Sequence, residues 1–126
     1  MIQGLDHVAI EVHDVEPVRR FYGGVLGLEV YFERELPPGG HAERLLFMKG
    51  PGFLLEFVQV PGKEVTDCFH LCFQVENVAK VVETLKAAGM EQIGTLMVVT
   101  REGGIRLTRG LVQGPVGERL ELMGPA

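Results

Sequence analysis

The sequence predicts an α+β fold made of two βαβββ modules, and three observations support that prediction. Residues 5–12 alternate apolar and polar side chains, and residues 69–75 repeat the pattern, each stretch with a histidine near its start, His7 and His70. An Asx residue and a helical apolar stripe follow each stretch. Each half then closes with three short alternating segments separated by turns rich in glycine and proline.

The length of 126 residues predicts a single domain, 1–126, with a sizeable apolar core. The Pro-Gly-Lys-Glu run at 61–64 marks the hinge, so that module 1 covers about residues 1–62 and module 2 about 63–126. Hydrophobic residues make up 46% and charged residues 23% of the chain, and this balance is typical of globular proteins.

Charge and cysteine content exclude several classes of partner. The net charge is −5 without a basic run, which argues against nucleic acid or an anionic membrane as a partner. No apolar run reaches the roughly 18 residues of a membrane span, and the N-terminus does not resemble a secretory signal. Cys68 and Cys72 lie on one predicted strand, about 13 Å apart, too far for a disulfide. These features predict a cytoplasmic protein with reduced thiols.

The first module is predicted to start with a strand over residues 4–12. Asp14 is a good N-cap for the following helix, Pro17 suits its first turn, and Gly27 ends it. The apolar stripe of that helix consists of Val18, Phe21, Tyr22, Val25 and Leu26. Strands over 28–36, 44–49 and 53–58 complete the module.

The second module repeats this order. A strand over residues 69–75 precedes a helix that Asn77 caps and Gly89 ends. Strands over 93–100, 105–113 and 119–123 follow. The predicted core-facing residues of the first strand are Phe69, Leu71, Phe73 and Val75, which places His70, Cys72 and Gln74 on its other face.

Two histidines and two glutamates occupy equivalent places in the two modules. Glu56 follows His7 by 49 residues, and Glu121 follows His70 by 51. All four fall on the non-core face of their strands, so they can converge if helices cover the other face. Taken singly, each is more often a hydrogen-bonded or ion-paired residue. Together, two imidazoles and two carboxylates predict a site for a divalent Zn, Ni, Co or Fe ion.

Other polar residues are weaker candidates for the site. Cys72 shares the face of His70, although a small buried core thiol is the commoner role. Glu11 and Gln74 are candidate supporting partners of the ligands, whereas His13 and His41 are expected to be solvated. Three arginines are candidates for contact with an anionic substrate: Arg34, Arg44 and Arg106.

Four motifs together resemble the vicinal oxygen chelate superfamily, which contains glyoxalases, bleomycin-resistance proteins and dioxygenases. They are Leu-Asp-His-Val-Ala-Ile-Glu-Val at 5–12, Phe-Tyr followed by Leu-Gly within 21–27, His-Leu-x-Phe-x-Val at 70–75 with Ala-Gly at 88–89, and Gly-x-x-Leu-Glu-Leu at 117–122. The match covers nearly the whole chain and is similar above all to glyoxalase I-like and methylmalonyl-CoA epimerase-like members.

The resemblance implies paired βαβββ modules that form a curved incomplete barrel, with the helices on its outer face and a divalent metal inside. It implies His7, Glu56, His70 and Glu121 as the four metal ligands. Related dioxygenases and fosfomycin-resistance enzymes lack a ligand at the position of Glu56, and epimerases usually carry glutamine there, so this set is closest to glyoxalase I. The resemblance also implies a homodimer, with the site within one chain or across two.

The activity implied is that of a metal-dependent lyase or isomerase, which moves a proton next to a carbonyl of a small-molecule substrate. Glu121 is the implied general base, with Glu56 as the second candidate. The alternatives are a methylmalonyl-CoA epimerase-like enzyme and a metal-free member that binds a small molecule or antibiotic; Glu56 disfavours an extradiol dioxygenase. Tyr31 and Phe32 stand where glyoxalase I usually has a glutathione-binding arginine, and the usual Asp-Pro-x-Gly is Gly-Pro-Val-Gly at 114–117. Both departures disfavour glutathione as cosubstrate.

Overall fold

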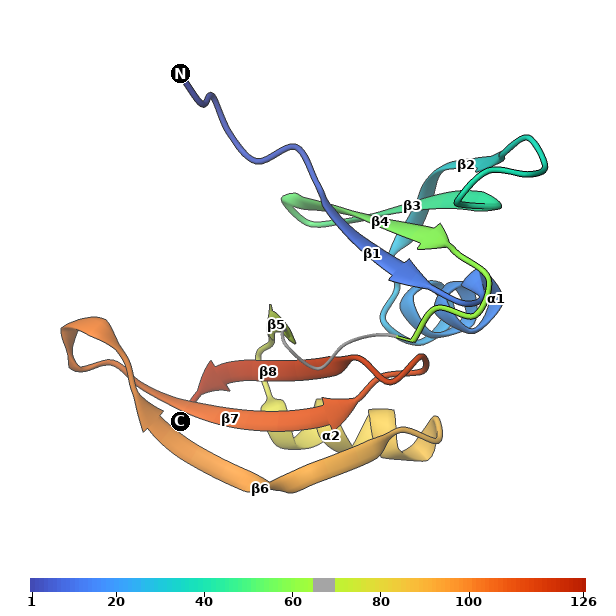
Figure 1. The fold of residues 1–126 in the computed structure, drawn as a ribbon. Helices are drawn as coiled ribbons and strands as arrows, with labels where there is room; N and C mark the ends of the chain where they lie inside the picture. The colour runs from blue at the N-terminus through green and yellow to red at the C-terminus, as the bar shows by residue number, and fades with distance from the viewer. Residues whose placement is uncertain (65–69) are drawn as a thin grey trace. The chain divides into compact units, whose positions relative to one another are not determined.

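The computed structural model describes residues 1–64 and 70–126, which belong to two compact units, 1–65 and 66–126 (Figure 1). The first unit contains β1 (Val8–Val12), α1 (Val15–Val18), η1 (Arg19–Val25), β2 (Glu29–Glu35), β3 (Arg44–Gly50) and β4 (Phe53–Gln59). The second contains β5 (His70–Gln74), α2 (Val78–Ala87), β6 (Glu91–Thr100), η2 (Glu102–Gly104), β7 (Arg106–Gln113) and β8 (Arg119–Pro125). The predicted α+β class and βαβββ order are therefore confirmed.

Each unit contains one four-stranded mixed sheet, and the two sheets have the same topology. The strand orders are β1-β4-β3-β2 and β5-β8-β7-β6. In both, the first strand pairs in parallel with the last, and the other neighbours are antiparallel. The register aligns Ala9 with Glu56 in the first sheet and Cys72 with Glu121 in the second. The strand that carries each glutamate thus lies beside the segment that carries the histidine of the same module.

The predicted helix starts and ends are confirmed. The Asp14 side chain accepts a hydrogen bond from the backbone N–H of Glu16, and the Asn77 side chain accepts one from that of Lys80. These bonds satisfy amide donors that the first turn of a helix leaves free. Gly27 and Gly89 follow the helical segments with φ of 79° and 93°, a conformation that only glycine adopts without a steric penalty.

The first helical segment differs from the regular α-helix that the apolar stripe predicted. It changes after Val18 into a π-helix, in which the Leu26 amide donates to the Phe21 carbonyl five residues earlier. Gly23 and Gly24 lie in this segment and weaken the preference for a tight α-helix. The wider turn rotates the last stripe residues away from the core: Val25 is exposed and Leu26 is half-buried.

Among the described strands, the first differs most from its predicted bounds. The first strand begins at Val8, not at residue 4, so that His7 precedes it. Because β1 is an edge strand that pairs with β4 from Val8 onward, the preceding residues lack ladder partners. The predictions made for Phe69 and Cys68 fall outside the described residues.

Helices cover one face of each sheet, as the alternation of side chains predicts. In the first unit, buried Ile10, Val12, Leu55 and Phe57 form the helix-covered face, where the Phe57 ring packs 4.8 Å from that of Tyr22. In the second unit, α2 packs on β6, β7 and β8, and Gly110 lies beneath it. A Cβ at Gly110 would lie 3.0 Å from Val82, so glycine permits this close approach. The opposite face of each sheet is left for the predicted polar residues.

No helix within residues 1–64 and 70–126 combines the length and the apolar character that crossing a membrane requires.

Candidate functional site

The uncovered face of the first sheet brings His7 and Glu56 together. His7 precedes β1 and Glu56 lies in the middle of β4, yet the Nε2 and Oε1 atoms of their side chains are 3.7 Å apart. This is too long for a hydrogen bond, whereas two donors about 2.1 Å from one ion lie about 3–4 Å apart. The Glu56 side chain is only 14% exposed and that of His7 32%. The pair thus has the spacing and the access that a bound cation needs.

The orientation of His7 is set by two neighbours. The Nδ1–H of the ring donates to the Asp6 carboxylate at 2.8 Å, which leaves the Nε2 lone pair on the side of Glu56. The ring also stands edge-on to Phe47, the cross-strand partner of Glu56, at a centroid distance of 5.3 Å. A metal-binding histidine almost always donates its other N–H to an acceptor, which is a carboxylate, a backbone carbonyl or water. The Asp6 contact therefore favours His7 as a ligand.

The second sheet brings His70 and Glu121 together in the same way. His70 is the first residue of β5, and its Nε2 atom lies 4.0 Å from Glu121 Oε2 in β8. The His70 side chain is 51% exposed and that of Glu121 11%. Among the described residues, no three His, Cys, Asp or Glu side chains are placed to bind one ion, so each unit offers a pair of donors.

Glu121 has two neighbours that Glu56 lacks at the equivalent places. Arg109 in β7 donates from Nε to Glu121 Oε2 at 2.8 Å, and the Cys72 thiol in β5 also donates to this carboxylate. Burial raises the pKa of the Glu121 carboxyl, but these two hydrogen bonds and the charge of Arg109 lower it below its ordinary value. Glu121 is therefore ionised at neutral pH.

Cys72 is exposed, so the expectation of a small buried core thiol is wrong for this residue. Its outward position follows from β5 being the edge strand, with Glu121 as its cross-strand neighbour. Partial burial of the sulfur, together with the hydrogen bond to Glu121 and the charge of that carboxylate, raises the pKa of the thiol to about 11. Cys72 is therefore a neutral thiol at physiological pH.

This raised pKa predicts slow alkylation of Cys72 despite its exposure. In chelator-treated Cys68→Ser protein, we expect iodoacetamide to react at pH 8 about tenfold more slowly than with an ordinary thiol, because the lower thiolate fraction is only partly offset by greater nucleophilicity. The rate should rise with pH up to about 11. Glu121→Gln should speed the reaction, and a rate that levels off near pH 9 would contradict the assignment. Mass spectrometry measures the modified fraction.

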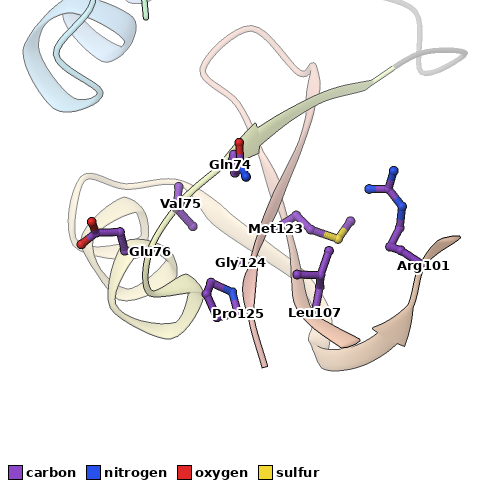
Figure 2. A pocket seen from close by; sticks show the side chains of 8 residues that line it. All are labelled: Gln74, Val75, Glu76, Arg101, Leu107, Met123, Gly124 and Pro125. Carbon is purple, nitrogen blue, oxygen red and sulfur yellow. The ribbon is translucent and has the colours of Figure 1, made fainter. Parts of the chain in front are cut away.

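A cavity of about 630 Å³ lies in the second unit, on the same face of the sheet as Glu121. Its polar lining residues are Gln74, Glu76 and Arg101, and its apolar ones include Leu107, Met123 and Pro125. In Figure 2, Leu107 and Met123 lie between Arg101 and the segment from Gln74 to Glu76. Met123 is the cross-strand partner of both Gln74 and Arg109. The cavity therefore begins two residues along the strands from Cys72 and Glu121.

A second cavity, of about 380 Å³, lies in the first unit and is lined by His7, Tyr31, Lys49 and Leu54, among others. The Lys49 ammonium lies 6.0 Å from the centroid of the Tyr31 ring. Tyr31, one of the two residues at the usual place of a glutathione-binding arginine, thus lies near a lysine that sequence inspection did not single out.

Several weaker candidates have other partners. The Glu11 carboxylate contacts His41 Nε2 at 2.9 Å and Lys63 Nζ at 3.1 Å, and neither contact involves His7. His41 is therefore hydrogen-bonded as well as exposed. Arg44 shares the helix-covered face of the first sheet, where it binds Glu33 at 3.0 Å, so it does not face the same side as Glu56. Gln74 is a cavity-lining residue.

Sequence inspection missed Arg109 and the role of Asp6. The turn over residues 114–117 sets the register of β7 on β8, which places Leu111 opposite Glu121 and Arg109 opposite Met123. Counting back from that turn by twos would have placed Arg109 on the face of Glu121. Asp6 lies within the segment predicted as the first strand, and nothing in the sequence pattern indicates that it bonds to the neighbouring ring.

Comparisons with known proteins agree with this architecture. The chain is 28% identical over 106 residues to the ethylmalonyl-CoA/methylmalonyl-CoA epimerase of Cereibacter sphaeroides, which covers 75% of this chain and 78% of the epimerase. A glyoxalase family protein from Enterococcus faecalis is 25% identical, with a TM-score of 0.73 over 97% of this chain and 98% of that one. The trypanothione-dependent glyoxalase I of Leishmania major is 22% identical, with a TM-score of 0.76 over 98% and 87%, and shows the same fold.

The family itself follows from a match over nearly the full length. Residues 4–122 match the model of the Glyoxalase/Bleomycin resistance protein/Dioxygenase superfamily, a range that includes both histidine–glutamate pairs. This superfamily contains many enzymes and also proteins without enzymatic activity. With its two βαβββ units and this match, the chain belongs to the Glyoxalase/Bleomycin resistance protein/Dioxygenase superfamily.

Proposed function

We propose that this protein is a divalent-metal-dependent lyase or isomerase, similar to glyoxalase I, that transfers a proton next to a carbonyl group. The observation that carries the proposal is the repeated pair, His7 with Glu56 and His70 with Glu121, at equivalent places of the two modules. Superfamily membership supports it, since many members bind a divalent metal at residues of this kind.

The four donors suit a divalent ion. Two neutral imidazoles and two carboxylates match Zn, Ni, Co or Fe in their divalent states, and Asp6 presents the free nitrogen of His7 toward Glu56. In the proposal, His7, Glu56, His70 and Glu121 hold the ion, either within one chain or across a homodimer. When bound, such an ion polarises the substrate oxygens and stabilises negative charge that develops on them.

The chain's own residues then move the proton. In the proposal, the Glu121 carboxylate removes the carbon-bound proton and returns it to the adjacent or opposite position, first as general base and then as general acid. Arg109 supports this role, because its hydrogen bond at 2.8 Å fixes the carboxylate and keeps it ionised. Glu56 is the second candidate for the base, since it is also mostly buried beside a histidine.

A specific observation favours a second activity, that of an acyl-CoA epimerase. The relative at 28% identity is named an ethylmalonyl-CoA/methylmalonyl-CoA epimerase. Tyr31 and Phe32, which replace the usual glutathione-binding arginine, also weigh against glutathione. Both activities use proton transfer beside a carbonyl, so they share the proposed machinery. The remaining alternative is a metal-free member that sequesters a small molecule. We place either enzyme in the cytoplasm as a homodimer.

Two assays on the same metal-loaded protein test the proposal. We expect turnover of the hemithioacetal of methylglyoxal and a thiol, or exchange of the α-proton of a 2-methyl-branched acyl-CoA with deuterated solvent. Turnover of the first supports the glyoxalase-like activity and exchange in the second the epimerase-like one. Treatment with a chelator should abolish either signal, and metal addition should restore it. Absence of both signals in protein with a bound metal would reject the proposal and favour a binding role.

A further inference from the structure

The two histidine–glutamate pairs are not chemically equivalent, although the modules repeat. The register places Ala9 beside Glu56 and Cys72 beside Glu121. Two residues beyond each glutamate, Val58 faces Leu45, whereas Met123 faces Arg109. The second module therefore adds a guanidinium to the uncovered face at a place where the first has a leucine. A structural repeat does not require this charge.

Among the described residues, Arg109 donates a side-chain hydrogen bond to Glu121 alone, which leaves most of its N–H groups for a further ligand. Of the five N–H groups of its guanidinium, the Nε–H donates to Glu121. Within residues 1–64 and 70–126, Glu121 is the single carboxylate at salt-bridge distance from Arg109, whose side chain is 31% exposed. The other nearby guanidinium differs, because both Nε and Nη2 of Arg101 are bound by Glu102 at 2.9 and 2.8 Å. Arg119 also lies on this face, opposite His70 and Gln113. Arg109 differs from it in contacting Glu121 directly while it keeps N–H groups for a substrate.

The surface next to Arg109 is hollow and partly apolar, and Gln74, Glu76 and Arg101 also line its cavity. Met123, the cross-strand neighbour of Arg109, lines the 630 Å³ cavity together with Leu107 and Pro125. An aliphatic chain that starts at Arg109 can therefore cover apolar side chains, and the burial of its CH₂ groups is favourable. Glu121, the proposed base, accepts a hydrogen bond from the Nε of the same guanidinium. The arrangement suits a small acid with an aliphatic portion.

We propose that Arg109 binds a carboxylate of the substrate through its Nη groups while its Nε remains on Glu121, so that the substrate is an aliphatic carboxylic acid or its acyl derivative with a free carboxylate. A guanidinium binds a planar carboxylate through two parallel hydrogen bonds, and a single cation matches one such charge. The substrate carbon next to that carboxylate is then held beside Glu121. Only the position of this carbon beside the proposed base rests on the proposed function. The binding of the carboxylate to Arg109 does not rest on it.

The test is an NMR titration of the full chain, treated with a chelator, with isobutyrate and its neutral isostere isobutyramide. We expect isobutyrate to shift the backbone amides of β7 and β8 and the Nε–H of Arg109, and isobutyramide to bind at least about tenfold more weakly, since hydrogen bonds to charged groups contribute about 1.5–3 kcal/mol. Arg109→Gln should lower the isobutyrate affinity about tenfold or more. Arg109→Lys should lower it less, because lysine keeps the charge without the bidentate geometry.

The matched control is Arg20→Gln, which removes an exposed arginine of η1 in the first unit. It should bind isobutyrate like the wild type. Equal affinity of the wild type for the acid and the amide, no detectable binding of the acid, or an unchanged affinity in Arg109→Gln would each overturn the inference. The comparison of acid and amide needs no variant, so a folding defect cannot obscure it. Since no metal or turnover enters this titration, its failure is separate from failure of the two activity assays.

Discussion

Replacing Glu121 by glutamine is expected to lower turnover about 10²- to 10⁴-fold, the usual contribution of a general acid–base residue. Glutamine has nearly the size of glutamate and keeps an acceptor for Arg109 Nε–H, so the environment in β8 is preserved. What the variant loses is the negative charge and the ability to accept a proton. The measurement is the initial rate of whichever substrate the two assays identify, together with the metal content of the purified variant.

The metal content separates two roles of Glu121. Retained metal with lost turnover assigns Glu121 as the base, whereas loss of both assigns it mainly as a ligand. Glu56→Gln is the informative comparison, because Glu56 is the second candidate base. Glu91→Gln, which alters an exposed residue at the start of β6, is the control for fold and handling. Full activity of Glu121→Gln would refute its assignment to proton transfer.

Replacing His7 by alanine is expected to weaken metal binding by more than about 100-fold, since even loss of an outer hydrogen-bonding partner costs a metal site about 10–100-fold in affinity. Asp6→Asn should cause that smaller loss, because Asp6 only orients the ring through its Nδ1. Elemental analysis and calorimetric titration with zinc or nickel measure both effects.

His13→Ala is the matched control for this comparison, since His13 is an exposed histidine that follows directly after β1. It should bind metal like the wild type. His70→Ala should resemble His7→Ala if both modules contribute donors to one ion. Wild-type metal affinity in the His7→Ala protein would remove His7 from the proposed ligand set, and a wild-type protein that binds no metal would favour the sequestration role.

Local sequence signals accounted for most of the fold. The alternation of side chains along the strands placed Glu56 and Glu121 on the face opposite Phe57 and Leu122. Phe57 and Leu122 are both buried in the structure. The caps Asp14 and Asn77 were also found correctly, because capping depends on a side chain and amides only a few residues away. The π-helix over 19–25 was missed, since the periodicity of its first residues is that of an α-helix.

Strand parity, capping and repetition are local or periodic properties of the chain, and they were sufficient to predict the two βαβββ modules and the strand face of the two histidines and two glutamates. The contacts between side chains come from the structure: each histidine lies near the glutamate of its own module, Asp6 orients His7, and Arg109 binds Glu121. All of these contacts except that of Asp6 with its neighbour His7 depend on which strands pair and in what register. Strand pairing and register are set by packing between segments far apart in the chain.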